Sequence, residues 1–298
     1  MLNRQGAVAG KSPDDGVAAH YGDPLREQRT IINGPGVVDR SHRGLLRVSG
    51  PDRLSWLHSL TSQHLETLAP GTWIEALVLS PHGHVEHHLD LVDDGEATWI
   101  HVEPGTAAAL AAYLDSMRFM LRVEVAEVTS THAVVTVVGD AGRDIVVERE
   151  ALDRTVDELH LPLVGHDAWE AIRVAAGQPR LGFETDHRTI PHEVGWIGPA
   201  VHLDKGCYRG QETVARVHNL GRPPRRLVLL HLDGTSETLP PPHTPIELDG
   251  RAVGFLGTAL HHAEMGPIAL AVVKRQTPDD AHLSVAGMAA KAERLVDA

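Results

Sequence analysis

The stretch LDKGCYRGQETVARVHNLGRPPRRLVLL, residues 203–230, marks the point where the pattern of the chain changes. Its central part, GQETVARVHN, is typical of a helix start, with Glu212 placed where an acid favours the first turn. Beyond GRPPRR, short apolar runs alternate with turn residues and no long helical pattern follows, which indicates a small β-barrel or sandwich. We therefore predict a domain boundary near residue 220 and a C-terminal β-barrel over 221–298.

The part of the chain before this boundary mixes strands and helices. Apolar runs predict strands at 45–50, 73–80, 84–92, 97–102, 132–139 and 144–148, and spaced apolar residues predict helices at 51–63, 106–121 and 166–177. This order favours an α+β class over a doubly wound parallel sheet. We predict two α+β lobes, over 31–130 and 131–220, after a flexible N-terminal segment at 1–30.

The composition excludes several classes of partner. The net charge is −13 with histidines neutral, which argues against a surface built to bind nucleic acid or an anionic membrane. Neither a signal peptide nor an apolar run of about 20 residues is found, so we expect no membrane span. A single cysteine excludes an internal disulfide. We expect a cytoplasmic protein, because thiols stay reduced there.

That cysteine, Cys207, follows Lys205, which is one of only four lysines, and lies between Gly206 and Gly210. Glycines permit a tight or left-handed turn, and the helix behind the loop directs free N–H groups and a positive dipole toward the thiol. Lys205 and Arg209 add positive charge, so the loop favours a reactive thiolate that acts as a nucleophile or a metal ligand. The alternative is a small, buried, apolar cysteine without chemistry.

The same stretch resembles the K-G-C-[FY]-x-G-Q-E signature of the YgfZ-type folate-binding proteins, which are relatives of the glycine-cleavage T-protein, an aminomethyltransferase. Three further segments are similar to segments of that family: VSGPDRLSWLHSLTSQ (48–63), AWEAIRVAAGQPRLGFETDHRTIPHEVGW (168–196) and ELDGRAVGFLGTAL (247–260). The resemblance covers residues 38–285, and the cysteine motif is its most specific part.

The resemblance implies a three-lobed fold, in which two ferredoxin-like α+β lobes and a small β-barrel surround a central hole that binds tetrahydrofolate or another reduced folate. It also implies a role in the assembly or repair of iron–sulfur proteins, with these proteins or cluster-assembly factors as partners, and links to tRNA modification. The family's reactive cysteine corresponds to Cys207. Lys205 is expected to share its catalytic role by stabilising negative charge, and the supporting motif residues are Gly206, Tyr208, Gly210, Gln211 and Glu212.

The resemblance also implies folate-binding residues. A carboxylate can accept two N–H donors from the edge of a pterin, and Asp144 stands near the place where the T-protein carries such a glutamate. Trp169 replaces an arginine of the T-protein and offers a plane for stacking, while Arg173 holds a position that can brace the site. Each has a structural alternative: a strand-edge acid, a core tryptophan and a structural arginine. Ala175 stands where many relatives carry a glutamate, so that carboxylate is missing.

The segment HGHVEHHLD, residues 82–90, departs from the T-protein pattern. The T-protein carries a catalytic aspartate in a paired-acid turn, and Glu86 and His87 stand at the corresponding positions. This change weakens a claim of aminomethyl transfer, although the longer Glu86 can substitute in part and both residues can contact the folate. A folate-dependent aminomethyltransferase or demethylase is the alternative function.

The same segment raises a metal alternative, since His82, His84, Glu86 and His88 fall on one face of a strand. Imidazole and carboxylate ligands at that spacing can bind zinc or iron. The chain contains 21 histidines, however, so that clusters arise by chance. We therefore interpret the segment as a polar strand face and predict no metal site.

Overall fold

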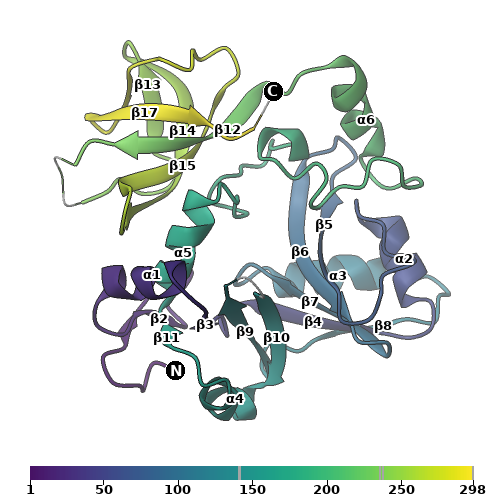
Figure 1. Cartoon of the computed structure of the whole chain (residues 1–298). Coiled ribbons are helices and arrows are strands. Elements are labelled where there is room, and N and C mark those ends of the chain that lie inside the picture. The colour runs from purple at the N-terminus through teal and green to yellow at the C-terminus, as the bar shows by residue number, and fades with distance from the viewer. Residues whose placement is uncertain (140–141, 235, 237, 297–298) are drawn as a thin grey trace. The chain divides into compact units, whose positions relative to one another are not determined.

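The computed structural model describes residues 1–139, 142–234, 236 and 238–296 (Figure 1). The contacts divide the chain into two compact units. The first unit consists of Met1–Val78 with His87–Glu170, and the second of Leu79–Glu86 with Ala171–Ala298. Each unit therefore joins stretches that are separated in the sequence. No helix among the described residues is both long and apolar enough to cross a membrane.

The first unit contains a five-stranded sheet in the order β5-β6-β7-β4-β8. Its strands are β4 (Gly44–Ser49), β5 (Trp73–Leu79), β6 (Val85–Asp93), β7 (Ala97–Val102) and β8 (Glu124–Glu127). Helices α2 (Arg53–Leu60) and α3 (Ala107–Ser116) supply leucines to the core of this sheet. Successive side chains of a strand point to opposite faces. Leu89 and Leu91 of β6 and Ile100 of β7 enter the core, so their direct neighbours along each strand face the other side of the sheet.

Helix α3 is shorter than the helix that the apolar pattern predicts over 106–121. It ends at Ser116, with Met117 as its C-cap. Phe119 has a positive φ of 48°, which does not continue a right-handed helix. Phe119 and Met120 are 84% and 97% exposed, so no core contact holds these residues in a helix despite their apolar side chains.

A second sheet in the first unit has four strands in the order β10-β9-β3-β11. Its elements are β3 (Gly36–Asp39), β9 (His132–Val138), β10 (Arg143–Glu148) and β11 (Leu163–Val164), with η1 (Arg149–Ala151) and α4 (Leu152–Glu158) between the last two strands. Strand β3 pairs antiparallel with β9 and parallel with β11. The sheet thus takes one strand from the range 31–130, which we assigned to the other lobe. Helix α5 (His166–Ala175) follows β11.

Residues 1–30, which the composition predicts to be flexible, have defined contacts in the structure. They contain the strand pair β1 (Val8–Ala9) and β2 (Ala18–His20) and the start of α1 (Pro24–Ile32). The side chain of Asp23 caps α1 by accepting a backbone N–H of its first turn. Arg4 forms ion pairs with Asp153 and Asp157. Contacts between such distant residues cannot be read from composition.

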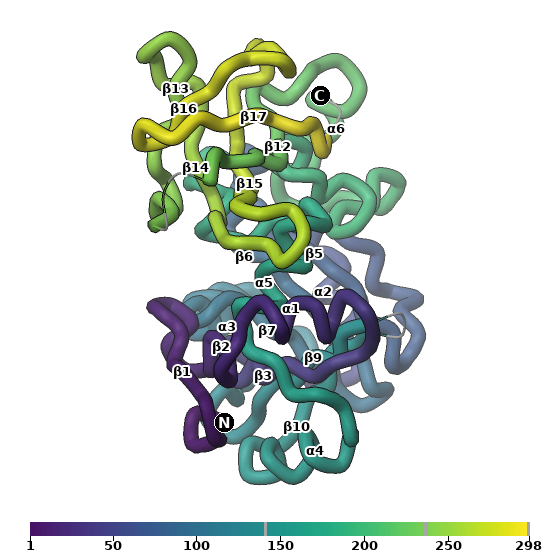
Figure 2. Tube along the Cα trace, turned by 60° about the vertical axis from the view of Figure 1, so that its left-hand side comes forward, coloured from purple at the N-terminus to yellow at the C-terminus, as the bar shows by residue number. Residues whose placement is uncertain are grey.

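The second unit contains a closed six-stranded barrel in the order β12-β15-β14-β13-β16-β17 (Figures 1 and 2). Its strands are β12 (Arg225–Leu232), β13 (Pro245–Leu248), β14 (Arg251–His262), β15 (Gly266–Lys274), β16 (Leu283–Val285) and β17 (Met288–Arg294), preceded by η2 (Pro191–Glu193) and α6 (Gln211–Leu220). Strand β17 pairs with β12 and closes the barrel around Leu230, Leu256 and Val273. The α+β class and the C-terminal barrel are confirmed, while residues 235, 237, 297 and 298 of the barrel range lie outside the described residues.

Candidate functional site

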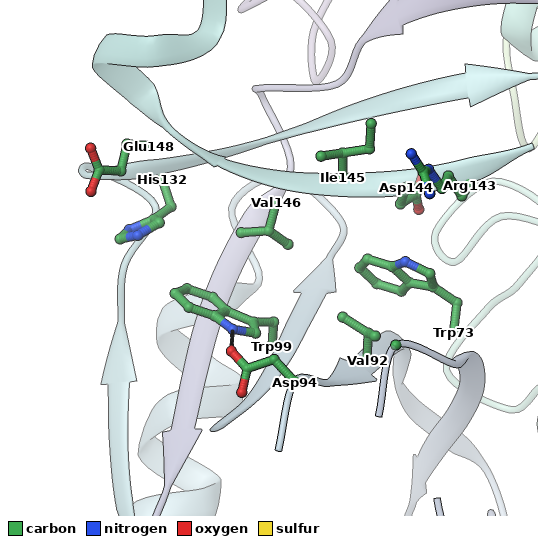
Figure 3. A pocket seen from close by; sticks show the side chains of 11 residues that line it. Trp73, Val92, Asp94, Trp99, His132, Arg143, Asp144, Ile145, Val146 and Glu148 are labelled. Carbon is green, nitrogen blue, oxygen red and sulfur yellow. Dashed lines mark hydrogen bonds between the residues drawn. The ribbon is translucent and has the colours of Figure 1, made fainter. Parts of the chain in front are cut away.

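A pocket of about 520 Å³ opens in the first unit along one side of β10 (Figure 3). Its walls include the indole rings of Trp73 and Trp99 and the side chains of Asp144 and Val146. Figure 3 shows Trp73 below Asp144 and Trp99 below Val146. Strand alternation explains this, since residues two apart on β10 share a face. The pocket thus combines two aromatic planes with one carboxylate.

The carboxylate of Asp144 is held by three groups of the chain. Its Oδ2 lies 2.7 Å from Nε2 of His101 and 3.5 Å from a guanidinium nitrogen of Arg40. Its Oδ1 accepts a short hydrogen bond from the hydroxyl of Thr136, the residue directly opposite on β9. Burial opposes the charged form, but Arg40 and His101 outweigh it and hold the pKa of Asp144 well below its usual range. Asp144 is therefore ionised at neutral pH.

Buried charges lie behind this carboxylate. His101 stands opposite Asp90 in the β6–β7 register, and Nε of Arg43 donates to its Nδ1 at 3.2 Å. Because Nδ1 accepts, Nε2 carries the proton and donates to Asp144. Burial lowers the pKa of His101, although Asp90 and Asp144 oppose this effect, so the ring is neutral. Arg43 also forms ion pairs with Asp90 and Glu103.

Arg40 connects two residues that the resemblance assigns to the folate. Its guanidinium lies 5.0 Å from the ring centroid of Trp169, within cation–π range, and it forms the ion pair with Asp144. The structure therefore brings Asp144 and Trp169 together through a cation that sequence reasoning missed. The pairing of β6 with β7 could have been predicted from the sequence, and it would have placed Asp90 opposite His101. Arg40 could not have been found in this way, because it follows β3, and no local pattern predicts that β3 pairs with β9.

Arg173 lies elsewhere, in the second unit. It is buried and donates to the carbonyl of Gln178 at 2.5 Å, to Glu184 at 3.2 Å and to the hydroxyl of Thr258 at 2.6 Å. These bonds join α5, the segment behind it and strand β14. These contacts favour a structural role for Arg173 over a role in binding folate, because its guanidinium N–H groups donate to other groups of the chain.

The cysteine loop belongs to the second unit. Cys207 is exposed, whereas Lys205 and Tyr208 on either side of it are buried. The ammonium of Lys205 lies 5.0 Å from the centroid of the Tyr208 ring, and burial raises the pKa of Tyr208 to about 12. The side-chain amide of Gln211 donates to the carbonyl of Lys205 at 3.3 Å. Buried neighbours thus fix a loop whose thiol stays open to solvent, in contrast with the alternative of a buried apolar cysteine.

Gly210 connects this loop to helix α6. It is the N-cap of the helix and has a φ of +83°. A Cβ atom at this position would lie 2.6 Å from the carbonyl oxygen of Ser80. Only glycine tolerates both the positive φ and this close approach. The absence of a side chain at Gly210 therefore lets the loop pack directly on the turn before β6. Gly206 is less restricted, since a Cβ there would meet no atom within 4 Å. Glu212 is exposed in the first turn of α6, as expected.

The part of the segment 82–90 that belongs to the second unit, residues 82–86, also contacts the cysteine loop. Glu86 forms an ion pair with Arg209 at 2.9 Å, and both side chains are partly exposed. His87 is half-buried. His88 is buried and lies 2.9 Å from Glu75, which with Asp90 raises the pKa of His88 against the effect of burial. The structure groups His88 with Glu75 and Asp90, not with His82 and His84.

The two α+β sheets and the closed barrel define the fold of glycine-cleavage aminomethyltransferases. The crystal structure of aminomethyltransferase T from Bartonella henselae superposes with a TM-score of 0.84 at 16% identity, covering 99% of this chain and 94% of that one. The chain belongs to the family described as the GCVT N-terminal domain, whose model matches residues 3–161. Residues 225–295 match the C-terminal β-barrel domain of CAF17.

Three relatives show where the chain stands within this family. A putative chloroplastic transferase of Arabidopsis thaliana is 25% identical, over 86% of this chain and 69% of its own length. An iron–sulfur cluster assembly factor IBA57 homolog of Mycosarcoma maydis is 26% identical, over 77% and 65%. The tRNA-modifying protein YgfZ of Colwellia psychrerythraea is 32% identical, over 31% and 29%. The resemblance of the chain to YgfZ-type relatives of the T-protein is thereby confirmed.

Proposed function

We propose that this protein binds a reduced folate in its first unit and supports the assembly or repair of iron–sulfur proteins through Cys207. The observation that carries the folate part is the ionised carboxylate of Asp144 on the wall of a pocket with two indole rings. The exposed thiol on a glycine-bounded loop carries the second part. The folate would be tetrahydrofolate or a one-carbon derivative of it.

The pocket has the chemistry that a pterin requires. Its volume of about 520 Å³ lies within the usual range for small-molecule sites, roughly 300–1,000 Å³. An ionised carboxylate offers about four lone-pair sites, and the three partners of Asp144 leave about one of them for a further donor. One N–H group on the edge of a pterin can therefore bind to it, while Trp73 and Trp99 provide apolar walls. Arg40 keeps the carboxylate charged for this purpose.

The cysteine has the accessibility that its proposed role requires. A thiol that transfers sulfur or binds a metal must meet a partner molecule, and Cys207 is exposed. Relatives carry the names iron–sulfur cluster assembly factor and tRNA-modifying protein, which supports iron–sulfur proteins or cluster-assembly factors as partners. A persistent free thiol also suits a cytoplasmic protein.

Isothermal titration calorimetry with tetrahydrofolate under anaerobic conditions tests the folate proposal. The wild-type chain should give saturable heat, and Asp144→Asn should weaken binding by about 1–3 kcal/mol, because it removes a charged acceptor. Asp115→Asn, which changes an exposed acid on α3, is the matched control and should bind normally. The absence of saturable heat with the wild-type chain would contradict the proposal.

The same preparation tests the alternative function. A folate-dependent aminomethyltransferase or demethylase would convert an aminomethyl or N-methyl substrate and produce methylene-tetrahydrofolate. Glu86, which stands where the T-protein has paired acids, is engaged by Arg209, so we expect no turnover. Formation of methylene-tetrahydrofolate above the level without protein would replace an accessory role by an enzymatic one.

A further inference from the structure

A buried cluster of two histidines and a carboxylate lies in the first unit, outside the pocket. Asp14 belongs to the loop between β1 and β2, His42 lies between β3 and β4, and His166 is the first residue of α5. Glu170 follows His166 by one helical turn on the same face. The exposed fractions of these side chains are 14%, 3%, 6% and 10%, in the order named.

The atoms of this cluster converge at the spacing of metal ligands. Nε2 of His42 lies 3.0 Å from Oδ1 of Asp14, and Nε2 of His166 lies 3.5 Å from Oδ2 of Asp14. Nε2 of His166 lies 3.9 Å from a carboxylate oxygen of Glu170. Four ligands around Zn²⁺, at bond lengths of about 2.0–2.2 Å, lie about 3.3–3.6 Å from one another. These three separations lie around this value, and the ligand atoms of Asp14, His42 and His166 all lie within 4.8 Å of one another.

The histidine rings provide a second, independent observation. Neither ring nitrogen of His42 and neither ring nitrogen of His166 has a hydrogen-bond partner among the described residues. The contact of 3.0 Å between His42 and Asp14 thus lacks hydrogen-bond geometry, although the atoms are close. Buried polar groups without partners are rare, and lone pairs of several ligands directed to one point are what an ion requires.

We infer that Asp14, His42 and His166, with Glu170 as the fourth ligand, bind a divalent transition metal ion such as Zn²⁺. Two imidazoles and two carboxylates suit this class of ion, and the burial of all four side chains indicates a closed, structural site. The ion would join three segments that are distant in the sequence: the loop between β1 and β2, the connection from β3 to β4, and the start of α5. It would therefore hold the N-terminal segment on the first unit. The inference does not depend on the proposed function.

Metal content and affinity test this inference on the full chain without an affinity tag. We expect one equivalent of Zn²⁺ to survive dialysis against a weak chelator, and its removal by a strong chelator to lower the melting temperature. Substitution by Co²⁺ should give the intense visible absorption of four-coordinate cobalt. His166→Asn and Asp14→Asn should each weaken Zn²⁺ binding by at least about 100-fold, the upper end of what loss of an outer partner of a metal site costs.

Two control variants separate this site from other histidines. His187→Asn changes an exposed histidine, and His88→Asn changes the group formed with Glu75 and Asp90, so both should keep the tightly bound ion. Should His166→Asn fail to fold, Asp14→Asn decides, because it is nearly isosteric and lies in a loop. The inference is overturned if the wild-type chain retains no equivalent of Zn²⁺ after dialysis, or if only adventitious binding to surface groups is found. It is also overturned if Asp14→Asn retains the ion or if His88→Asn loses it.

Discussion

Arg40 contacts two residues that the resemblance assigns to one ligand, and it illustrates what a single side chain contributes to the site. Its guanidinium pairs with Asp144 and lies over Trp169. His101 and Thr136 complete the partners of Asp144. The aspartate could be proposed from its position in a motif, but its ionisation depends on these three neighbours. At the residue scale, the chemistry of the site is therefore a property of contacts.

The pH dependence of stability should reveal these contacts. The folded-state pKa of Asp144 lies below the ordinary value of 3.8, so the carboxylate stabilises the fold above that pH and loses this effect as the pH falls below it. Asp144→Asn should therefore lower the free energy of unfolding more at pH 6 than at pH 3, as measured by urea titration. Asp115→Asn should change it little at either pH. An equal loss for Asp144→Asn at both values would contradict the assignment.

Cys207 permits a prediction about function without stability. Because its side chain is exposed, Cys207→Ser should change the free energy of unfolding by less than about 0.5 kcal/mol. In cells that lack the wild-type protein, the same variant should fail to restore the activities of iron–sulfur enzymes. Restoration to the wild-type level would remove Cys207 from the proposed mechanism. Ser59→Ala, on helix α2, serves as the control for expression level and should restore activity.

At the element scale, the cysteine loop, helix α6 and the turn before β6 form one packed assembly. The left-handed Gly210 ends the loop and starts the helix, and its Cα faces the carbonyl of Ser80. Gly83 in the same turn has a φ of +78°, and a Cβ there would lie 2.9 Å from Thr213 of α6. Arg209 and Glu86 add an ion pair. Gly210 of the motif and Gly83 of the turn therefore have a packing reason beyond flexibility.

Two glycine variants test this packing. Gly210→Ala combines a positive φ with a contact of 2.6 Å to a backbone oxygen, so it should destabilise the second unit by about 1–3 kcal/mol. Gly206→Ala, four residues earlier in the same loop, meets no atom within 4 Å and should stay within about 0.5 kcal/mol of the wild type. Thermal or urea unfolding measures both. Similar losses for the two variants would show that the loop is not held as described.

At the scale of the whole molecule, segments that are distant in the sequence share each unit. Strand β3 pairs with β9 and β11, so the second sheet takes residues 36–39 from a range that we assigned to the other lobe. Residues 79–86 belong to the second unit, although the rest of β5 before them and the rest of β6 after them belong to the first. The net charge of −13 is a further property of the whole chain. It bears on the partners that the protein can bind.

The charge predicts weak contact with nucleic acid. Affinity for RNA depends on clustered cations that release counterions, and a net charge of −13 opposes such binding. One relative is named a tRNA-modifying protein, but we expect this chain not to bind tRNA at about 150 mM salt in a filter or mobility assay. Non-specific binding of nucleic acid usually has dissociation constants of about 10⁻⁴–10⁻⁶ M, and we expect no binding in that range. Micromolar binding with a steep salt dependence would instead indicate a basic surface that the overall charge conceals.

The sequence by itself determined the elements, the fold class and the family of this protein. Apolar periodicity and turn residues act over a few neighbours, so they predicted four of the five strands of the first sheet, helices α2 and α5, and a small C-terminal barrel or sandwich, but not β8. The motif around Cys207 was sufficient for the family. These signals are local, and each can be read without knowing where the rest of the chain lies.

Only the tertiary structure decided which charges meet. The contacts of Arg40, His101 and Asp144, and the cluster of Asp14, His42 and His166, join residues from strands and loops that are far apart in the chain. Pairing of β3 with β9 and of β6 with β7 creates the first, and the docking of the loop between β1 and β2 creates the second. Electrostatic contacts and metal ligands depend on distances in space, which local patterns do not encode.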